Sequence, residues 1–295
     1  MKATSRAYLA LAGGLLSLGF SAIFVRGAEA PGTVTAFYRM ALGAAFMALP
    51  FTLHRHNRPA PRRRGILLAA LAGAFFGADL TLWATGIVRS GATIPTLMAN
   101  TAPLWVGLGA WLIFQERLSA GFWAGTVLAL LGAGAVLGGD LRAGDIFQNG
   151  GSLGLGAAVF YGAYYLVAQR ARDHLDTLTF FWISTATSAL FLVIVNLLIG
   201  HPLVGYPRTT WLIFLASGSL VQIGGWLLIN YAQGRLPAPL VSVTLLGQPV
   251  LTAVIAWPLF GETLNGAQTL GGAAVLAGVF WVHRAQSQPV GGEPT

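Results

Sequence analysis

The sequence predicts an all-α integral membrane protein with ten transmembrane helices, arranged as two inverted five-helix repeats around a central cavity. The first observation is composition: 55% of the 295 residues are hydrophobic and 9% are charged, whereas soluble proteins carry about 25% charged residues. The second is that apolar runs long enough to cross about 30 Å of hydrocarbon recur along the whole chain. The third is a stretch that occurs once in each half of the chain.

The repeated stretch contains a proline and a later glutamate in each half. The residues that coincide under one fixed offset are Arg89 with Arg235, Pro103 with Pro249, Trp111 with Trp257, Phe114 with Phe260, Glu116 with Glu262, Leu118 with Leu264, Gly125 with Gly271 and Gly132 with Gly278. We therefore expect residues 1–144 to form the first repeat and residues 145–295 the second, which ends in a short disordered tail. Repeated halves in a membrane chain are typical of a transporter whose site lies between them.

Ten spans are expected from the apolar runs. Their approximate positions are residues 7–27, 33–53, 66–89, 92–115, 119–139, 150–169, 176–200, 210–233, 237–260 and 265–284. With the N-terminus inside, the inner segments hold twelve basic residues and the outer segments hold four. An excess of Lys and Arg marks the cytoplasmic side, so both termini are expected in the cytoplasm. Because each half has an odd number of spans, the second half is expected to cross the membrane upside down.

Several classes of function are excluded by what the sequence lacks. The net charge of +8 is spread over short loops rather than one folded basic face, so we expect no nucleic-acid partner. Without Cys there is no thiolate metal site and no thiol nucleophile, and we expect no metal and no cofactor. No G-x-x-x-x-G-K-[ST] loop is present, which excludes an ATP-driven pump. The basic loop from Leu53 to Gly65 is interpreted mainly as a topology signal, with binding of anionic lipid as the alternative.

Pro103 and Pro249 each lie near the middle of an expected span. A proline removes one helical hydrogen bond and clashes with the carbonyl four residues earlier. The carbonyls of Ala99 and Leu245 are therefore candidates for free acceptors at bilayer depth. Two interpretations remain open: a pair of symmetric hinges beside the site, or static kinks that serve packing.

Four acidic or basic residues stand out by position. Arg39 and Asp79 are expected inside spans, where a charge costs at least about 2.5–3.5 kcal/mol on insertion scales. They could pair with each other, or Asp79 could relay protons or meet a cationic group of a substrate. Glu116 and Glu262 lie at span ends, and we expect them to accept from N–H groups at the start of the next helix.

Other polar and aromatic residues recur at helical spacing on six spans. They are Phe20 and Phe24 on the first, Asp79 and Trp83 on the third, Thr96 and Asn100 on the fourth, Tyr161 and Tyr165 on the sixth, Gln222, Trp226 and Asn230 on the eighth, and Thr244 and Gln248 on the ninth. Such stripes in membrane helices more often serve packing than ligand binding. The amides nevertheless cluster on the same few helices, and buried amides need partners, which a wet central cavity supplies. We take these residues as the candidate substrate-binding set.

These features resemble the EamA branch of the drug/metabolite transporter superfamily. The resemblance covers roughly residues 7–284 and includes two copies of about five helices, each with a proline in its fourth span and a Gly-rich fifth span. Arg39 matches an arginine that the family typically carries in its second span, while Phe180-Phe-Trp182 occupies that region of the second half. The resemblance implies a ten-helix carrier in the bacterial inner membrane, usually an exporter of amino acids or other small metabolites. It also implies a central cavity formed largely by helices 1, 3, 4, 6, 8 and 9.

The functional hypothesis is export of a small, partly apolar metabolite by alternating access, with an amino acid as the best candidate. Choline-like compounds and cationic drugs stay open because aromatic rings hold quaternary ammonium groups. The alternative is a membrane-embedded enzyme acting on a lipid or isoprenoid, although such enzymes usually need clustered acids or His and only Asp79 is expected to be deep. We expect no enzymatic activity, a monomer or weak dimer in the lipid bilayer, and either proton coupling or uniport.

Overall fold

The computed structural model describes residues 3–56, 58–90, 93–137, 150–260 and 265–286, and within these ranges the chain is helical, with no strand. Nine helical stretches in the described ranges are long and apolar enough to cross a membrane. The chain is therefore a multi-pass membrane protein. The expected C-terminal tail and Glu262 lie outside the described residues.

The helices follow the expected spans to within a few residues. In the first half they are α1 (Ala3–Gly19), α2 (Ser21–Gly27), α3 (Gly32–His56), α4 (Arg63–Ser90), α5 (Thr93–Ala99), α6 (Ala102–Phe114) and α7 (Ala120–Leu137). In the second half they are α9 (Gly150–Arg172), α10 (Thr177–Ile199), α11 (Arg208–Ala216), the π-helix η1 (Ser217–Trp226), α12 (Leu227–Gln233), α13 (Ala238–Thr244), the 3₁₀ turn η2 (Leu245–Gly247), α14 (Gln248–Phe260) and α15 (Gly266–Gln286). The last of these, α15, has the length of a span but is not among the nine most apolar stretches.

Four of the long helical stretches are interrupted near their middle. The first breaks at Phe20, between α1 and α2, and another at Asn100 and Thr101, between α5 and α6. The stretch from α11 to α12 contains the π-helix η1, and the one from α13 to α14 contains the 3₁₀ turn η2. Pro103 is the second residue of α6 and Pro249 the second of α14, so each proline follows a break directly. Broken helices at membrane depth are tolerated where they line a cavity.

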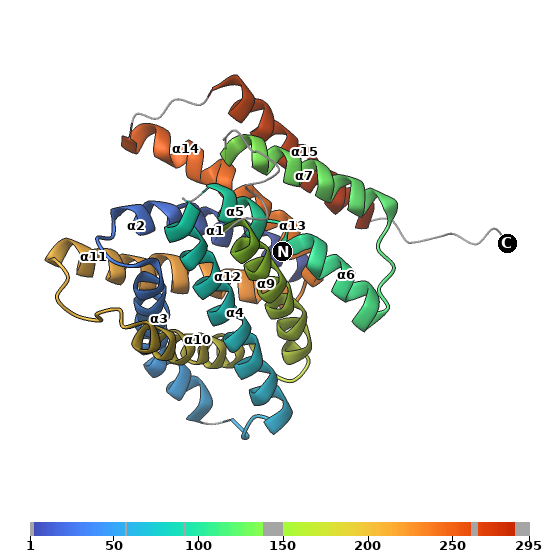
Figure 1. The fold of residues 1–295 in the computed structure, drawn as a ribbon. Coiled ribbons are helices and arrows are strands. Elements are labelled where there is room, and N and C mark those ends of the chain that lie inside the picture. The colour runs from blue at the N-terminus through green and yellow to red at the C-terminus, as the bar shows by residue number, and fades with distance from the viewer. Residues whose placement is uncertain (1–2, 57, 91–92, 138–149, 261–264, 287–295) are drawn as a thin grey trace.

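The bundle is built from a few close helix pairs (Figure 1). Helix α4 packs between α9 and α10, and α10 also packs against α3. Helix α1 packs against η1, α12 and α14. Helices α7 and α15 form a separate pair that lies to one side of the bundle in Figure 1. The central helices α1, α4, α9 and η1 are therefore the ones placed to surround a site.

Glycines bring α7 and α15 into backbone contact. A Cβ atom at Gly132 would lie 2.5 Å from the carbonyl oxygen of Gly271, and one at Gly278 would lie 2.5 Å from that of Gly125. Residue numbers rise along one helix as they fall along the other, so the pair is antiparallel. Small residues permit this close approach in lipid, where burial from water supplies no driving force.

Candidate functional site

A cavity of about 110 Å³ lies where the broken helices meet the central pair α4 and α9. Its lining comes from both halves of the chain: Leu18, Ser21, Arg39, Phe76, Asp79, Leu80, Trp83, Thr96, Ala99, Asn100, Tyr161, Trp226 and Gln248. Helix α4 supplies four of these side chains from one face, at the spacing i, i+3, i+4 and i+7. The breaks beside Ser21, Asn100 and Gln248 place polar groups at the cavity wall.

The structure brings part of the predicted residue set to this cavity. The members that line it are Asp79, Trp83, Thr96, Asn100, Tyr161, Trp226 and Gln248, together with the intramembrane Arg39. The members that do not line it are Phe20, Phe24, Tyr165, Gln222, Asn230 and Thr244.

Arg39 and Asp79 are the two charged residues that are buried within the described part of the chain, at 7% and 6% exposure. They line the same cavity but form no ion pair with each other among the described residues. Arg39 Nη1 instead donates to Ser21 Oγ at 3.4 Å, and its Nε has no partner. Burying a charge without a full set of partners is costly. The cavity therefore presents one positive and one negative group, each able to take a further partner.

The uncharged polar groups of the cavity are partly engaged by the protein. Trp83 Nε1 donates to Thr96 Oγ1 at 3.1 Å, which joins α4 to α5. Gln248 Nε2 donates to the carbonyl oxygen of Leu18 at 3.3 Å, which joins α14 to α1. The amide nitrogen Nδ2 of Asn100 is buried and has no partner. The site thus combines fixed hydrogen bonds between helices with one free amide donor beside the charges.

An aromatic cluster forms the apolar side of the cavity. The Phe76 ring centroid lies 4.6 Å from that of Trp226 and 4.9 Å from that of Tyr164. Tyr161 completes the cluster, with its ring centroid 6.1 Å from that of Trp226 and its hydroxyl 3.1 Å from the Tyr165 hydroxyl. Trp226 and Tyr164 are 4% and 2% exposed. The rings therefore close this side of the cavity by direct contact.

Some residues of the site were missed by sequence reasoning. Phe76 precedes Asp79 by three positions on α4, so extending the Asp79–Trp83 stripe by one turn would have included it. Tyr164 lies between the two predicted tyrosines and packs against Phe76. Ser21 reaches Arg39 because the chain breaks at Phe20, and no proline or glycine pair signals that break.

The eighth expected span shows why a helical stripe fails. Gln222 and Trp226 both lie in the π-helix η1, where hydrogen bonds run from i to i+5, so residues four apart no longer lie above one another. Trp226 lines the cavity, whereas Gln222 Nε2 donates to Thr185 Oγ1 at 3.1 Å, toward α10. Asn230 accepts from the Tyr164 hydroxyl at 3.1 Å. These two amides join helices instead of lining the cavity.

The remaining predicted residues also make contacts within the protein. Phe20 and Phe24 stack on each other across the α1–α2 break, with centroids 6.4 Å apart. The Thr244 hydroxyl lies 2.9 Å from His283 Nε2 on α15. None of these three lines the cavity in this conformation.

Two expectations about span ends and prolines need correction. Leu245 does not keep a free carbonyl, because the 3₁₀ turn η2 lets the Gln248 N–H donate to it. Glu116 does not cap the next helix: Ser119 Oγ accepts from the Phe122 N–H at 3.2 Å. Glu116 Oε1 accepts from Gln169 Nε2 at 3.0 Å instead. The chain reverses at Gln115 in a left-handed conformation, with φ of 58°, and α7 begins only after Ser119.

The fold and the cavity are those of a membrane transporter, and comparison with known proteins identifies the family. A model of the EamA-like transporter family matches residues 5–138 and again residues 148–284. The chain belongs to this family.

Relatives named as transporters and one solved structure of the same fold are similar to this chain. The protein named "Riboflavin transporter" of Vibrio cholerae is 26% identical, with 88% of this chain and 85% of that protein covered. The protein named "Probable terminal-alkyne amino-acid exporter" of Streptantibioticus cattleyicolor is also 26% identical, with 76% of this chain and 75% of that protein covered. A solved crystal structure superposes with a TM-score of 0.79 at 18% identity, and the match covers 98% of this chain and 99% of that one. This structural likeness concerns the fold.

Proposed function

We propose that this chain is a secondary transporter that exports a small zwitterionic metabolite, best an amino acid, across the bacterial inner membrane by alternating access. The observation that carries the proposal is the pair of buried, opposite, mutually unpaired charges in one cavity. Arg39 would hold a carboxylate, since a guanidinium binds carboxylates in a two-pronged geometry. Asp79 would hold the ammonium group, and Trp226 and Tyr161 would pack against an apolar side chain.

The size of the cavity supports a small substrate. Its volume of about 110 Å³ is below the roughly 300–1,000 Å³ that is typical of sites for drug-sized ligands. A substrate of amino-acid size therefore suits this conformation better than a large ring system. Among the relatives, one protein is named as an exporter of an amino acid, which is consistent with this choice.

Alternating access is supported by the repeat. The family model matches the chain twice, along residues 5–138 and 148–284, close to the proposed repeats 1–144 and 145–295. Under the repeat offset Gly125 corresponds to Gly271 and Gly132 to Gly278. The contact between Gly125 and Gly278 therefore maps onto the contact between Gly271 and Gly132, as a twofold axis requires. The equivalent helices α7 and α15 are antiparallel, so the twofold axis that relates them is perpendicular to both helices. This direction supports inverted repeats, with α15 as the tenth span.

The conformation is proposed to be closed toward the cytoplasm. With the N-terminus in the cytoplasm, the ends of α6 and α9 and the start of α13 lie on that side. Gln169 joins all three, because it donates to Glu116 Oε1 and accepts from the Ala238 N–H, both at 3.0 Å. The breaks before Pro103 and Pro249 lie at the cavity and would serve as the hinges for reopening.

The test is efflux of radiolabelled amino acids from loaded liposomes that contain the purified protein. Asp79→Asn should lower the rate about tenfold or more, since a hydrogen bond to a charged group contributes about 1.5–3 kcal/mol. Trp226→Ala should also lower the rate, because it removes the ring that packs against the apolar part of the substrate. Glu29→Gln, an acid-to-amide change at an exposed loop residue, should leave the rate unchanged. Native rates in both cavity variants would remove the proposed site. A pH gradient imposed on the same liposomes should change the efflux rate if the protein exchanges protons, and should leave the rate unchanged if it is a uniporter.

A further inference from the structure

A second, larger pocket of about 680 Å³ lies at one end of the helix bundle, away from the central cavity. Its lining comes from the connection between α3 and α4 and the connection between α9 and α10: Arg55, Arg58, Pro59, Ala60, Pro61, Arg62, Asp173, His174, Leu175 and Asp176. The start of α4 contacts the α9–α10 connection, because a Cβ atom at Gly65 would lie 2.9 Å from His174 Cβ. The pocket is thus formed by two segments that are far apart in the sequence.

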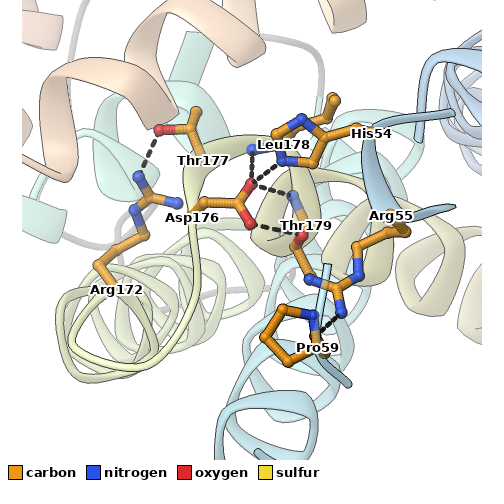
Figure 2. A network of polar contacts seen from close by, with 8 residues as sticks. All are labelled: His54, Arg55, Pro59, Arg172, Asp176, Thr177, Leu178 and Thr179. Atoms are coloured by element: carbon orange, nitrogen blue, oxygen red, sulfur yellow. Dashed lines mark hydrogen bonds and ion pairs between the residues drawn. The ribbon is translucent and has the colours of Figure 1, made fainter. Parts of the chain in front are cut away.

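Three arginines give this pocket its basic character. Arg55 donates to the carbonyl oxygen of Pro59 (Figure 2), which holds the loop in a turn. Arg58 and Arg62 are exposed, and within the described residues their side chains form neither ion pairs nor hydrogen bonds. Each guanidinium therefore presents a full set of N–H donors to the pocket.

The two acidic residues of the pocket already have partners. Figure 2 shows Asp176 accepting from the N–H groups of Leu178 and Thr179 at 3.1 and 3.0 Å. The same carboxylate lies 3.0 Å from His54 Nε2 and accepts from the Thr179 hydroxyl at 2.8 Å. Asp173 Oδ2 lies 3.8 Å from Arg170 Nη1. Neither carboxylate pairs with Arg58 or Arg62.

The adjoining helix start adds to the positive potential. Helix α4 begins at Arg63, directly after the pocket residue Arg62, and has no acidic residue in its first turn. The N-terminus of a helix carries partial positive charge and favours anions. The start of α10, on the other wall, is already compensated by Asp176 as its cap. The uncompensated positive groups therefore lie on the Arg58–Arg63 side of the pocket.

We propose that this pocket binds the phosphodiester headgroup of an anionic phospholipid. It lies where α3 and α9 end and α4 and α10 begin, which is the depth of lipid headgroups for helices that span the bilayer. Its volume falls within the range of ligand pockets. Arginines in a basic pocket between helix ends hold phosphate oxygens through paired, charge-assisted hydrogen bonds. The inference does not depend on the transported substrate.

The test measures thermal unfolding of the purified full chain in a neutral detergent while phosphatidylglycerol is added. A ligand that binds the folded state raises the unfolding temperature, here by about 5 °C at saturation. The combined variant Arg58→Gln and Arg62→Gln should weaken the apparent lipid affinity about tenfold. The control Arg64→Gln removes the same type of charge two residues beyond Arg62, outside the pocket lining, and should keep the native affinity.

Three results would overturn the inference. Equal stabilisation by phosphatidylglycerol and by phosphatidylcholine, which is zwitterionic and has no net charge, would show no selectivity for an anion. Equal loss of affinity in Arg64→Gln would show a diffuse surface charge instead of this pocket. Saturation by glycerol phosphate at the same concentration as the lipid would identify a site for free phosphate esters. Amino-acid efflux is measured separately, so failure here leaves the transport proposal intact.

Discussion

Arg39 and Asp79 line one cavity as the two buried charges of the described chain, yet they do not pair with each other. The donor contact of Arg39 is the Ser21 hydroxyl, and its Nε has no partner. A locked ion pair would satisfy both groups and leave nothing for a ligand. The observed arrangement leaves each charge available, which is the basis of the proposed zwitterion site.

The first prediction concerns the stability of Asp79→Asn without substrate. Breaking a buried ion pair by removing one partner costs about 3–5 kcal/mol. Because Asp79 has no such pair here, neutralising it should leave the unfolding temperature unchanged or raise it, while ligand-induced stabilisation is lost. Tryptophan fluorescence during heating measures both effects. A fall of about 6 °C or more would show that Arg39 and Asp79 are locked together, and Glu29→Gln serves as the control.

The all-helical membrane character and two of the breaks could be predicted from the sequence, because apolar length and proline position are local properties. Pro103 and Pro249 mark the breaks in two spans, since a proline removes a helical hydrogen bond wherever it lies. Neither the break at Phe20 nor the π-helix η1 contains a proline. The π-helix packs closely against its neighbours. A Cβ atom at Gly218 would lie 2.8 Å from Leu42 Cβ, and one at Gly225 would lie 2.7 Å from Leu18 Cδ1.

Helical spacing led most directly to the cavity in helix α4, which is regular throughout. Asp79 and Trp83 share a face of the uninterrupted helix α4, so their spacing placed both at the cavity. Gln222 and Asn230 flank Trp226 at the same spacing, but Gln222, in the π-helix, donates to Thr185, and Asn230, in the α-helix α12, accepts from Tyr164. Which face of a helix points inward also depends on its neighbours, and a single sequence does not specify that rotation.

The second prediction tests the glycine contact between α7 and α15. In Gly278→Ala the new Cβ would lie 2.5 Å from the Gly125 carbonyl oxygen and 2.6 Å from the Ala129 nitrogen. The helices must move apart, and overpacking of this kind costs about 1–3 kcal/mol. We expect a lower unfolding temperature in detergent. Gly266→Ala, on the same helix with nothing within 4 Å of the added Cβ, should not lower it; equal behaviour of the two variants would contradict the backbone contact.

The third prediction concerns Gln169, which joins the ends of α6 and α9 to the start of α13. Removing its two hydrogen bonds in Gln169→Ala should favour separation of these helices. The chain has no cysteine, so Leu166→Cys provides a single thiol at a position that is 8% exposed and contacts Gly109 of α6. With the two hydrogen bonds contributing about 1 kcal/mol each, thiol modification should be about thirtyfold faster in the Gln169→Ala background.

The control for that experiment is Gln115→Ala. Within the described part of the chain, the Gln115 side chain bonds only to the Leu112 carbonyl oxygen of its own helix end, so its loss should not change the labelling rate of Leu166→Cys. Equal rates in the Gln169→Ala and Gln115→Ala backgrounds would show that Gln169 does not hold this end of the bundle closed.

The last prediction concerns the dependence of stability on pH through Asp176, which caps α10 outside the span (Figure 2). Partial burial raises the pKa of this carboxyl, but hydrogen bonds from Thr179 and the charge of His54 outweigh burial and hold the pKa below its ordinary value. The stabilisation is therefore present above the ordinary pKa of about 3.9 and is lost as the pH falls through the lower pKa of the folded state. Asp176→Asn keeps a capping side chain and removes the charge. The difference in unfolding temperature between native protein and variant should shrink between about pH 5 and pH 3, and a difference that stays constant over this range would contradict the role of the charge.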